Sequence, residues 1–108
     1  MPVYNKLVRD YIPEIIEQSG KSYKTKVLIE EAYVEALKRK LQEEVTEYSD
    51  TKTNREAVEE LGDILEIIHA LAAQHDSSIE EVNEKRLEKA RSRGAFDNRI
   101  LLIDVEDK

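Results

Sequence analysis

The spacing of hydrophobic residues predicts three long helices in the middle of the chain. Apolar side chains recur every three or four positions over about 30–48, about 53–75 and about 77–93. This interval places them along one face of an amphipathic helix, with polar residues on the other face. We therefore expect three helices separated by short polar breaks.

Polar residues with helix-capping spacing bound these predicted helices. Thr53 and Glu56 form a capping-box pair, in which the hydroxyl and the carboxylate satisfy free backbone N–H groups of the first turn. The last long helix stops before Gly94, a residue type that suits a helix C-terminus. It has two overlapping candidate starts of the capping-box kind, which are Ser77 with Glu80 and Ser78 with Glu81.

Two smaller elements are expected nearer the ends of the chain. Proline at a first helical position and glycine at the far end favour a short helix from about Pro13 to Ser19. Residues 23–29 alternate with a period of two, and 99–105 is their natural partner, so we expect the two segments to pair. The predicted fold class is therefore mainly α: a bundle of three longer helices plus a short N-terminal helix, with a minor two-stranded β element.

Composition agrees with one helix-rich domain that spans residues 1–108. A chain of 108 residues is too short for two independent hydrophobic cores. Hydrophobic residues make up 40% and charged residues 38%, with only 3 glycines and 2 prolines, which fits a helical domain. The net charge of −7 disfavours nucleic acid and anionic membranes as partners, although a metal ion can still bring phosphates to an acidic protein.

The residue types present also limit the chemistry. The chain has no cysteine, which excludes disulfides, thiolate metal sites and thiol nucleophiles. No apolar run approaches the ~20 residues that a membrane span needs, and residues 1–10 lack the apolar core of a signal peptide. We expect a cytoplasmic protein.

Four acidic residues occupy unusual positions on the predicted helices. On a helical wheel, Glu44 falls inside the apolar arc of its helix, and Glu47 lies about 40° beyond the edge of that arc. The next helix repeats this arrangement, because Glu60 falls inside its arc and Asp63 about 40° outside. A carboxylate on a core face is costly unless it is paired, protonated or metal-bound. An antiparallel pair of helices would bring these four carboxylates together around a common partner.

Two kinds of partner remain open for these acids. All-oxygen ligands, without cysteine or a ligand-spaced histidine pair, suit Mg²⁺ or Mn²⁺ and not zinc. The simpler alternative is that the inward acids sit at the rim of the bundle and form salt bridges with basic side chains. Such a chain would be a non-catalytic, acidic oligomerisation module. Its candidate cations are Lys38, Lys40 and Arg86.

The acidic residues belong to a longer motif. Residues 40–47 read Lys-Leu-Gln-Glu-Glu-Val-Thr-Glu, and after twelve further residues 60–63 read Glu-Leu-Gly-Asp. This resembles the EExxE and ExxD signature of the MazG-like nucleotide pyrophosphohydrolases, within the all-α nucleoside triphosphate pyrophosphatase superfamily. The separation of the two blocks is at the lower limit of that family's range.

Three further blocks strengthen the resemblance. Residues 5–15 look like the N-terminal block of a small single-domain subgroup labelled phosphoribosyl-ATP pyrophosphohydrolase-like. Residues 83–85 resemble the family's NxK motif, and residues 93–96 approximate its terminal RGGF, with Ala95 in place of the second glycine. The blocks occur in the family's order and cover nearly the whole chain.

The resemblance implies a role for each matching residue. In the family, the second and third acids of EExxE and both acids of ExxD hold Mg²⁺ ions that bridge to the triphosphate, and the NxK residues line the nucleotide site. Glu43 matches the first acid of EExxE, whose role in the family is less uniform. Carried over by position, the expected metal-binding and catalytic acids are Glu44, Glu47, Glu60 and Asp63. The expected substrate-binding residues are Lys6, Arg9, Asn83, Lys85 and Arg93.

The resemblance also implies an activity. It is the Mg²⁺-dependent hydrolysis of a nucleoside triphosphate between its α and β phosphates, which yields a monophosphate and pyrophosphate and would clear non-standard nucleotides. The same site would serve the hydrolysis of phosphoribosyl-ATP in histidine biosynthesis. The sequence does not decide between a nucleoside triphosphate and phosphoribosyl-ATP as the substrate. The family's bundle is completed by association of chains, and the second long helix is apolar over about half its circumference. We therefore expect a homodimer or homotetramer.

Overall fold

The computed structural model describes residues 4–107, and this part of the chain forms four helices and no strand. The predicted mainly α class is therefore confirmed. The three long helices begin and end within a few residues of the predicted positions, and the short N-terminal helix is displaced by one residue. The helices are α1 (Ile12–Gln18), α2 (Glu30–Ser49), α3 (Asn54–Gln74) and α4 (Ile79–Arg93).

Side-chain caps explain where two of these helices start. The Thr53 hydroxyl accepts a hydrogen bond from the Glu56 N–H at 3.1 Å and donates one to the Glu56 carboxylate at 3.0 Å. Ser78 caps α4 by accepting a hydrogen bond from the Glu81 N–H at 3.2 Å. The second of the two candidate starts is therefore the one that forms. Gly94 ends α4 with a φ of 84°, which is accessible to glycine at low cost.

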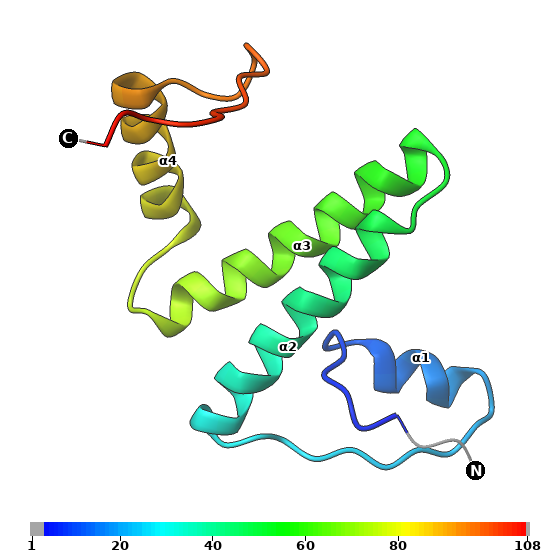
Figure 1. The fold of residues 1–108 in the computed structure, drawn as a ribbon. Coiled ribbons are helices and arrows are strands. Elements are labelled where there is room, and N and C mark those ends of the chain that lie inside the picture. The colour runs from blue at the N-terminus through cyan, green and yellow to red at the C-terminus, as the bar shows by residue number, and fades with distance from the viewer. Residues whose placement is uncertain (1–3, 108) are drawn as a thin grey trace.

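Helices α2 and α3 form an antiparallel hairpin that holds the small core (Figure 1). Leu37 of α2 is only 3% exposed, and Ile67 and Ala72 of α3 are also buried. Within the described residues, α4 contacts α3 but not α2, and α1 packs against none of the other helices. Among the described residues, α2 and α3 are thus the only two helices that pack extensively against each other.

The molecule is elongated for its size. Its radius of gyration is 18.6 Å and its principal extents are 62 × 36 × 27 Å, whereas a compact domain of this length has a radius of about 13 Å. Because so little of the chain packs on itself, α3 leaves Val58, Leu61 and Leu65 exposed on one stripe. No helix of the described residues is long and apolar enough to cross a membrane.

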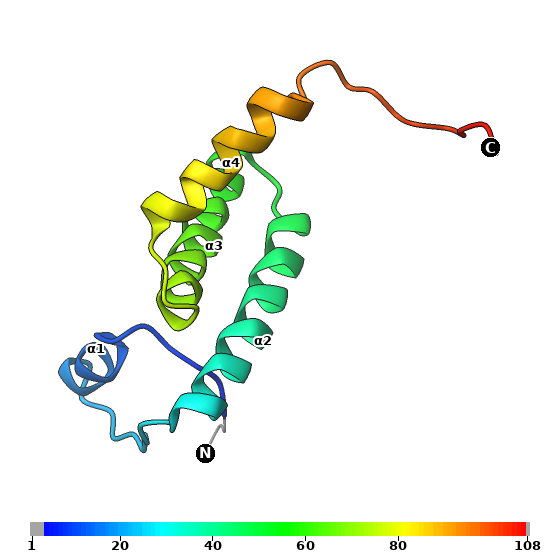
Figure 2. The same ribbon diagram turned by 90° about the vertical axis from the view of Figure 1, so that its left-hand side faces the viewer.

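The predicted β element is not formed within the described residues. Residues 23–29 lead into α2, whereas residues 99–105 follow α4, and the two segments lie at opposite ends of the molecule in both views (Figures 1 and 2). A strand needs a neighbour to satisfy its backbone N–H and C=O groups. The predicted pairing within one chain is therefore wrong, because the helices between the two segments carry them apart.

Candidate metal centre

Three carboxylates from the α2–α3 hairpin meet at one point. Glu44 and Glu47 lie three residues apart on α2 and therefore on neighbouring turns of the same face, and Glu60 comes from α3. One carboxylate oxygen from each of the three lies within 4.8 Å of the others. Because oxygens at this separation can share one cation, these residues form a candidate metal-binding triad. We refer to Glu44, Glu47 and Glu60 as the acidic triad.

Burial makes this cluster different from the many other acids of the chain. Glu44 is 7% exposed and is the only buried charged residue within residues 4–107. Its Oε2 atom and the Oε2 atom of Glu60 are buried without a hydrogen-bond donor in the described part of the chain. A buried carboxylate oxygen without a partner is costly, so the positions of these two atoms favour a shared proton or a bound cation. The other oxygen of Glu44 lies 3.6 Å from the Lys40 ammonium.

The surroundings of Glu60 in the triad raise its pKa from 4.5 to about 8. The largest cause is a hydrogen bond to Glu44, which requires a proton on one of the two carboxyls. The further causes that raise this pKa are, in decreasing order, the burial of the carboxyl, a hydrogen bond to Glu47 and the negative charges of Glu44 and Glu47. Without a metal ion, Glu60 therefore keeps its proton at neutral pH. A divalent cation would replace that proton by supplying positive charge to the same oxygens.

Asp63, the fourth predicted ligand, lies one turn beyond Glu60 but is not in the triad. Its Oδ1 atom accepts a hydrogen bond from the guanidinium of Arg9 at 2.7 Å, and both side chains are about half exposed. Two residues that were predicted for different roles thus form an ion pair. We call residues 4–29, which precede α2, the N-terminal segment. Within residues 4–107, the Arg9–Asp63 pair is the only hydrogen bond or ion pair between side chains that links this segment to the hairpin.

The other predicted substrate-binding residues lie outside the triad. The Lys6 ammonium lies 5.8 Å from the centre of the Tyr4 ring. On α4, Asn83 accepts a hydrogen bond from Arg86 at 2.9 Å, and Lys85 lies 3.6 Å from Glu88. Arg93 is the last residue of that helix and is exposed. No hydrogen bond or ion pair among the described residues joins any of them to the acidic triad.

The alternative in which basic side chains form salt bridges with the inward acids is supported at one position. Of its three candidate cations, Lys40 reaches Glu44, whereas Lys38 lies 3.7 Å from Glu35 on the outer face of α2. Arg86 bonds to Asn83 on α4. One ammonium that faces one oxygen of Glu44 leaves the buried oxygens described above without a partner. Salt bridges therefore account for only part of the triad.

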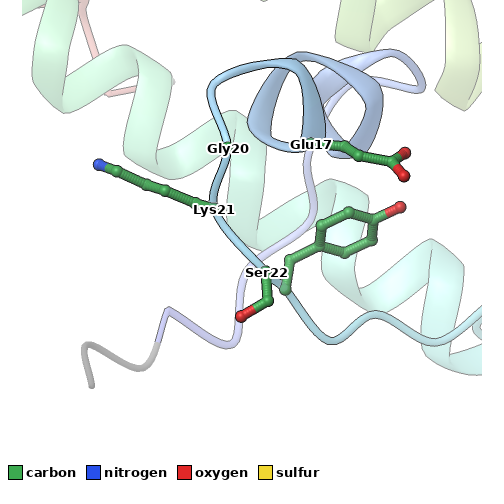
Figure 3. A pocket seen from close by; sticks show the side chains of 5 residues that line it. Glu17, Gly20, Lys21 and Ser22 are labelled. Atoms are coloured by element: carbon green, nitrogen blue, oxygen red, sulfur yellow. The ribbon is translucent and has the colours of Figure 1, made fainter.

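Two shallow hollows on the surface were not predicted from the sequence. One lies at the end of α1 and is lined by Glu17, Gly20, Lys21, Ser22 and Tyr23; the Lys21 side chain points away from Glu17 there (Figure 3). The other lies on α2 between Arg39 and Glu47, so it borders the acidic triad. Such hollows depend on how loops and side chains fold back, and no residue pattern predicts them.

No protein-family model, no curated protein and no solved structure matches this chain. What supports the site is therefore its own chemistry. Two acids that the helical wheel places inward meet across a hairpin, and both carry a buried oxygen without a donor within the described residues.

Proposed function

We propose that this chain is a Mg²⁺-dependent nucleotide pyrophosphohydrolase, which hydrolyses a nucleoside triphosphate between its α and β phosphates and releases pyrophosphate. The observation that carries the proposal is the acidic triad with its two buried oxygens that lack a donor in the described chain. The acidic blocks that resemble the MazG-like signature contribute all three of these residues. A biological role in clearing non-standard nucleotides follows from the same resemblance.

The donor set fits magnesium. All three side chains offer carboxylate oxygens, which Mg²⁺ prefers, and Mn²⁺ accepts the same ligands. Glu44, Glu47 and Glu60 would hold the ion, and Asp63 would join them when it is released from Arg9. When bound, Mg²⁺ supplies positive charge to the phosphate oxygens and lowers the pKa of water.

The remaining work falls to side chains of the protein. Glu47 is the exposed member of the triad, so it is placed to accept a proton from a water that attacks the phosphoanhydride. Arg9 lies next to Asp63 and would direct its guanidinium to a phosphate of the bound nucleotide. We assign Lys6, Asn83, Lys85 and Arg93 to the rest of the nucleotide site, which then requires a closer approach of α4 or a second chain.

A second chain is part of the proposal. The stripe of Val58, Leu61 and Leu65 on α3 is exposed, and very few of the described side chains are buried. An exposed apolar stripe of this kind is typical of a surface that is covered by association. We propose that the protein is a homodimer or a homotetramer in which this stripe is buried.

Pyrophosphate release tests the function directly. The assay compares canonical triphosphates, modified triphosphates and phosphoribosyl-ATP, each with Mg²⁺ and with a chelator. The variants Glu44→Gln and Glu60→Gln should lose at least ~100-fold in activity, because they remove ligands and not merely the groups that support them. Glu43→Gln, an exposed neighbour with the same change of charge, should stay within about twofold of wild type.

Other outcomes separate the alternatives. Activity on phosphoribosyl-ATP alone would place the same site in histidine biosynthesis. Activity on no substrate, together with a melting temperature that Mg²⁺ does not change, would contradict the proposal and favour the oligomerisation module, which the Lys40–Glu44 ion pair supports. Full activity in Glu44→Gln would show that the acidic triad is not the site.

A further inference from the structure

Two extended segments have the properties of strands but pair with no other segment among residues 4–107. Val27 is 99% exposed and Ile103 is 87% exposed. Within residues 4–107, the backbone groups of 22–28 and of 100–107 take part in no backbone hydrogen bond. Exposed, unpaired backbone next to apolar side chains is a template for pairing with another strand. We call residues 23–29 the entry segment, in which only the terminal Ile29 C=O accepts a backbone hydrogen bond, and residues 100–107 the C-terminal segment.

The charges of the two segments are complementary. The entry segment carries Lys24 and Lys26, and the C-terminal segment carries Asp104, Glu106 and Asp107. Lys24 and Lys26 are two positions apart and therefore lie on one face of an extended strand, and the same holds for Asp104 and Glu106. Asp107, at the end of the C-terminal segment, lies on its other face. The alternate positions, which include Val27 in one segment and Ile103 in the other, lie on the opposite face.

One antiparallel register matches both faces at once. It places Val27 opposite Ile103, and every other pair follows from that alignment. Oppositely charged pairs and apolar pairs that face each other directly stabilise an antiparallel ladder. In this register the charged face pairs Lys24 with Glu106 and Lys26 with Asp104, and the other face pairs Thr25 with Val105 and Ile29 with Leu101.

The two segments of one chain do not meet. One precedes α2 and the other follows α4, and they lie at opposite ends of an elongated molecule (Figures 1 and 2). A second copy of the chain offers both segments in the same form. Two copies related by a twofold axis would exchange C-terminal segments reciprocally, which closes the assembly without leaving a segment unpaired.

We propose that the C-terminal segment of one copy pairs as an antiparallel strand with the entry segment of a second copy, and the reverse. The occupant of each exposed segment is thus this chain itself. The proposal does not depend on the enzymatic activity, because it rests on residues outside the acidic triad. This strand pairing would be a second contact between copies, in addition to the α3 stripe, and the two contacts can be tested separately.

Charge reversal followed by mixing tests whether the pairing occurs between chains. One variant carries Lys24→Glu and Lys26→Glu, and the other carries Asp104→Lys and Glu106→Lys. Each variant alone places like charges opposite each other, so its dimer dissociation constant in analytical ultracentrifugation should rise at least ~10-fold. In a heterodimer of the two variants, one ladder joins the reversed entry segment to the reversed C-terminal segment, so opposite charges face each other again. The other ladder joins the two unchanged segments and keeps the original pairing. The mixture should therefore return to wild-type affinity, and unchanged circular dichroism controls for folding.

Disulfide trapping tests the register. Because the chain has no cysteine, Val27→Cys and Ile103→Cys can be introduced into separate chains, mixed and oxidised. The mixture should form a covalent heterodimer whose linked peptides are identified by mass spectrometry. The matched control combines Val27→Cys with Leu102→Cys, whose side chain lies on the other face of the strand and should crosslink much less.

Four results would overturn the proposal. They are a wild-type protein that stays monomeric, charge-reversed variants that associate as tightly as wild type, a mixture no tighter than its components, and crosslinking between positions 27 and 103 no greater than in the control. A dimer that forms without this crosslink would mean that the α3 stripe alone joins the copies.

Discussion

The facing carboxylates of Glu44 and Glu60 dominate the chemistry of single side chains in this protein. Two unit charges ~5 Å apart repel by ~3 kcal/mol at an effective dielectric constant of 20. A proton on Glu60 relieves this repulsion. The hydrogen bond to Glu44 that this proton allows and the burial of the site are the larger reasons why the pKa of Glu60 is raised to about 8. A bound cation relieves it as well. Protonation and metal binding therefore compete for the same oxygens.

The raised pKa of Glu60 predicts how stability changes with pH. Since the folded state holds this proton more tightly than the unfolded state, the free energy of unfolding of the metal-free protein should fall as pH rises from about 4.5 to about 8. Urea denaturation in the presence of a chelator measures this slope. Glu60→Gln should flatten it, whereas Glu59→Gln, an exposed change on the same helix, should not. Equal slopes in all three proteins would contradict the prediction.

The helices depend on their ends as well as on their apolar faces. Thr53 and Ser78 each accept a hydrogen bond from a backbone N–H in the first turn of their helix. Arg9 connects the N-terminal segment to α3 through Asp63. These contacts set where α3 and α4 begin and which part of the N-terminal segment lies near the acidic triad.

The two serines before α4 give a matched pair for testing the cap. Ser78→Ala should destabilise the protein by about 1 kcal/mol, because it leaves the Glu81 N–H without its acceptor. Ser77→Ala removes only an exposed hydrogen bond to the Glu81 side chain and should cost less. Thermal denaturation of both variants decides this. An equal or larger cost for Ser77→Ala would place the cap one residue earlier.

Removal of the Arg9 side chain should free Asp63 for a metal ion. Because the ion pair is half exposed, Arg9→Ala should change the stability by less than about 1 kcal/mol. The same variant should bind Mg²⁺ more tightly and turn over nucleotide more slowly, since a competitor for Asp63 and a phosphate contact are lost together. Calorimetric titration with Mg²⁺ measures the first effect. Arg55→Ala, which breaks the exposed Arg55–Glu59 pair at the start of α3, is the control, and equal Mg²⁺ affinity in both variants would contradict the prediction.

The molecule as a whole is open and elongated, with a radius of gyration of 18.6 Å. Within residues 4–107, only the α2–α3 hairpin contains buried residues, and α3 exposes an apolar stripe on its other side. A small domain that buries so little has few sources of stability other than association. The proposed association would cover the exposed apolar stripe and add to this small buried core.

Association predicts that stability depends on protein concentration. The melting temperature should rise as the concentration of the chain rises, because a dimer or tetramer is favoured by mass action. Leu61→Glu, on the exposed stripe of α3, should lower the melting temperature and the mass in light scattering. Glu59→Lys, a charge change at an exposed position of the same helix, is the control. A monomer with a melting temperature independent of concentration would contradict this prediction.

Much of the local structure could be predicted because it depends on residues close together in sequence. The period of apolar side chains located α2, α3 and α4, and the capping spacing located the starts of α3 and α4. The choice between Ser77 and Ser78 remained open, since both have an acid three residues later. The two β-favouring segments can be recognised from the sequence, but their pairing cannot, because a strand's neighbour depends on where distant parts of the chain lie.

The amino-acid order alone was enough to place Glu44 and Glu60 on the apolar faces of two consecutive helices, since helical geometry is regular. The tertiary structure decided which acids meet. It brought Glu47 to these two residues and left Asp63 paired with Arg9, which lies 54 residues away in the sequence. The physical reason is that a helical wheel specifies direction but not distance, and a long-range partner competes for a carboxylate only after the chain has folded.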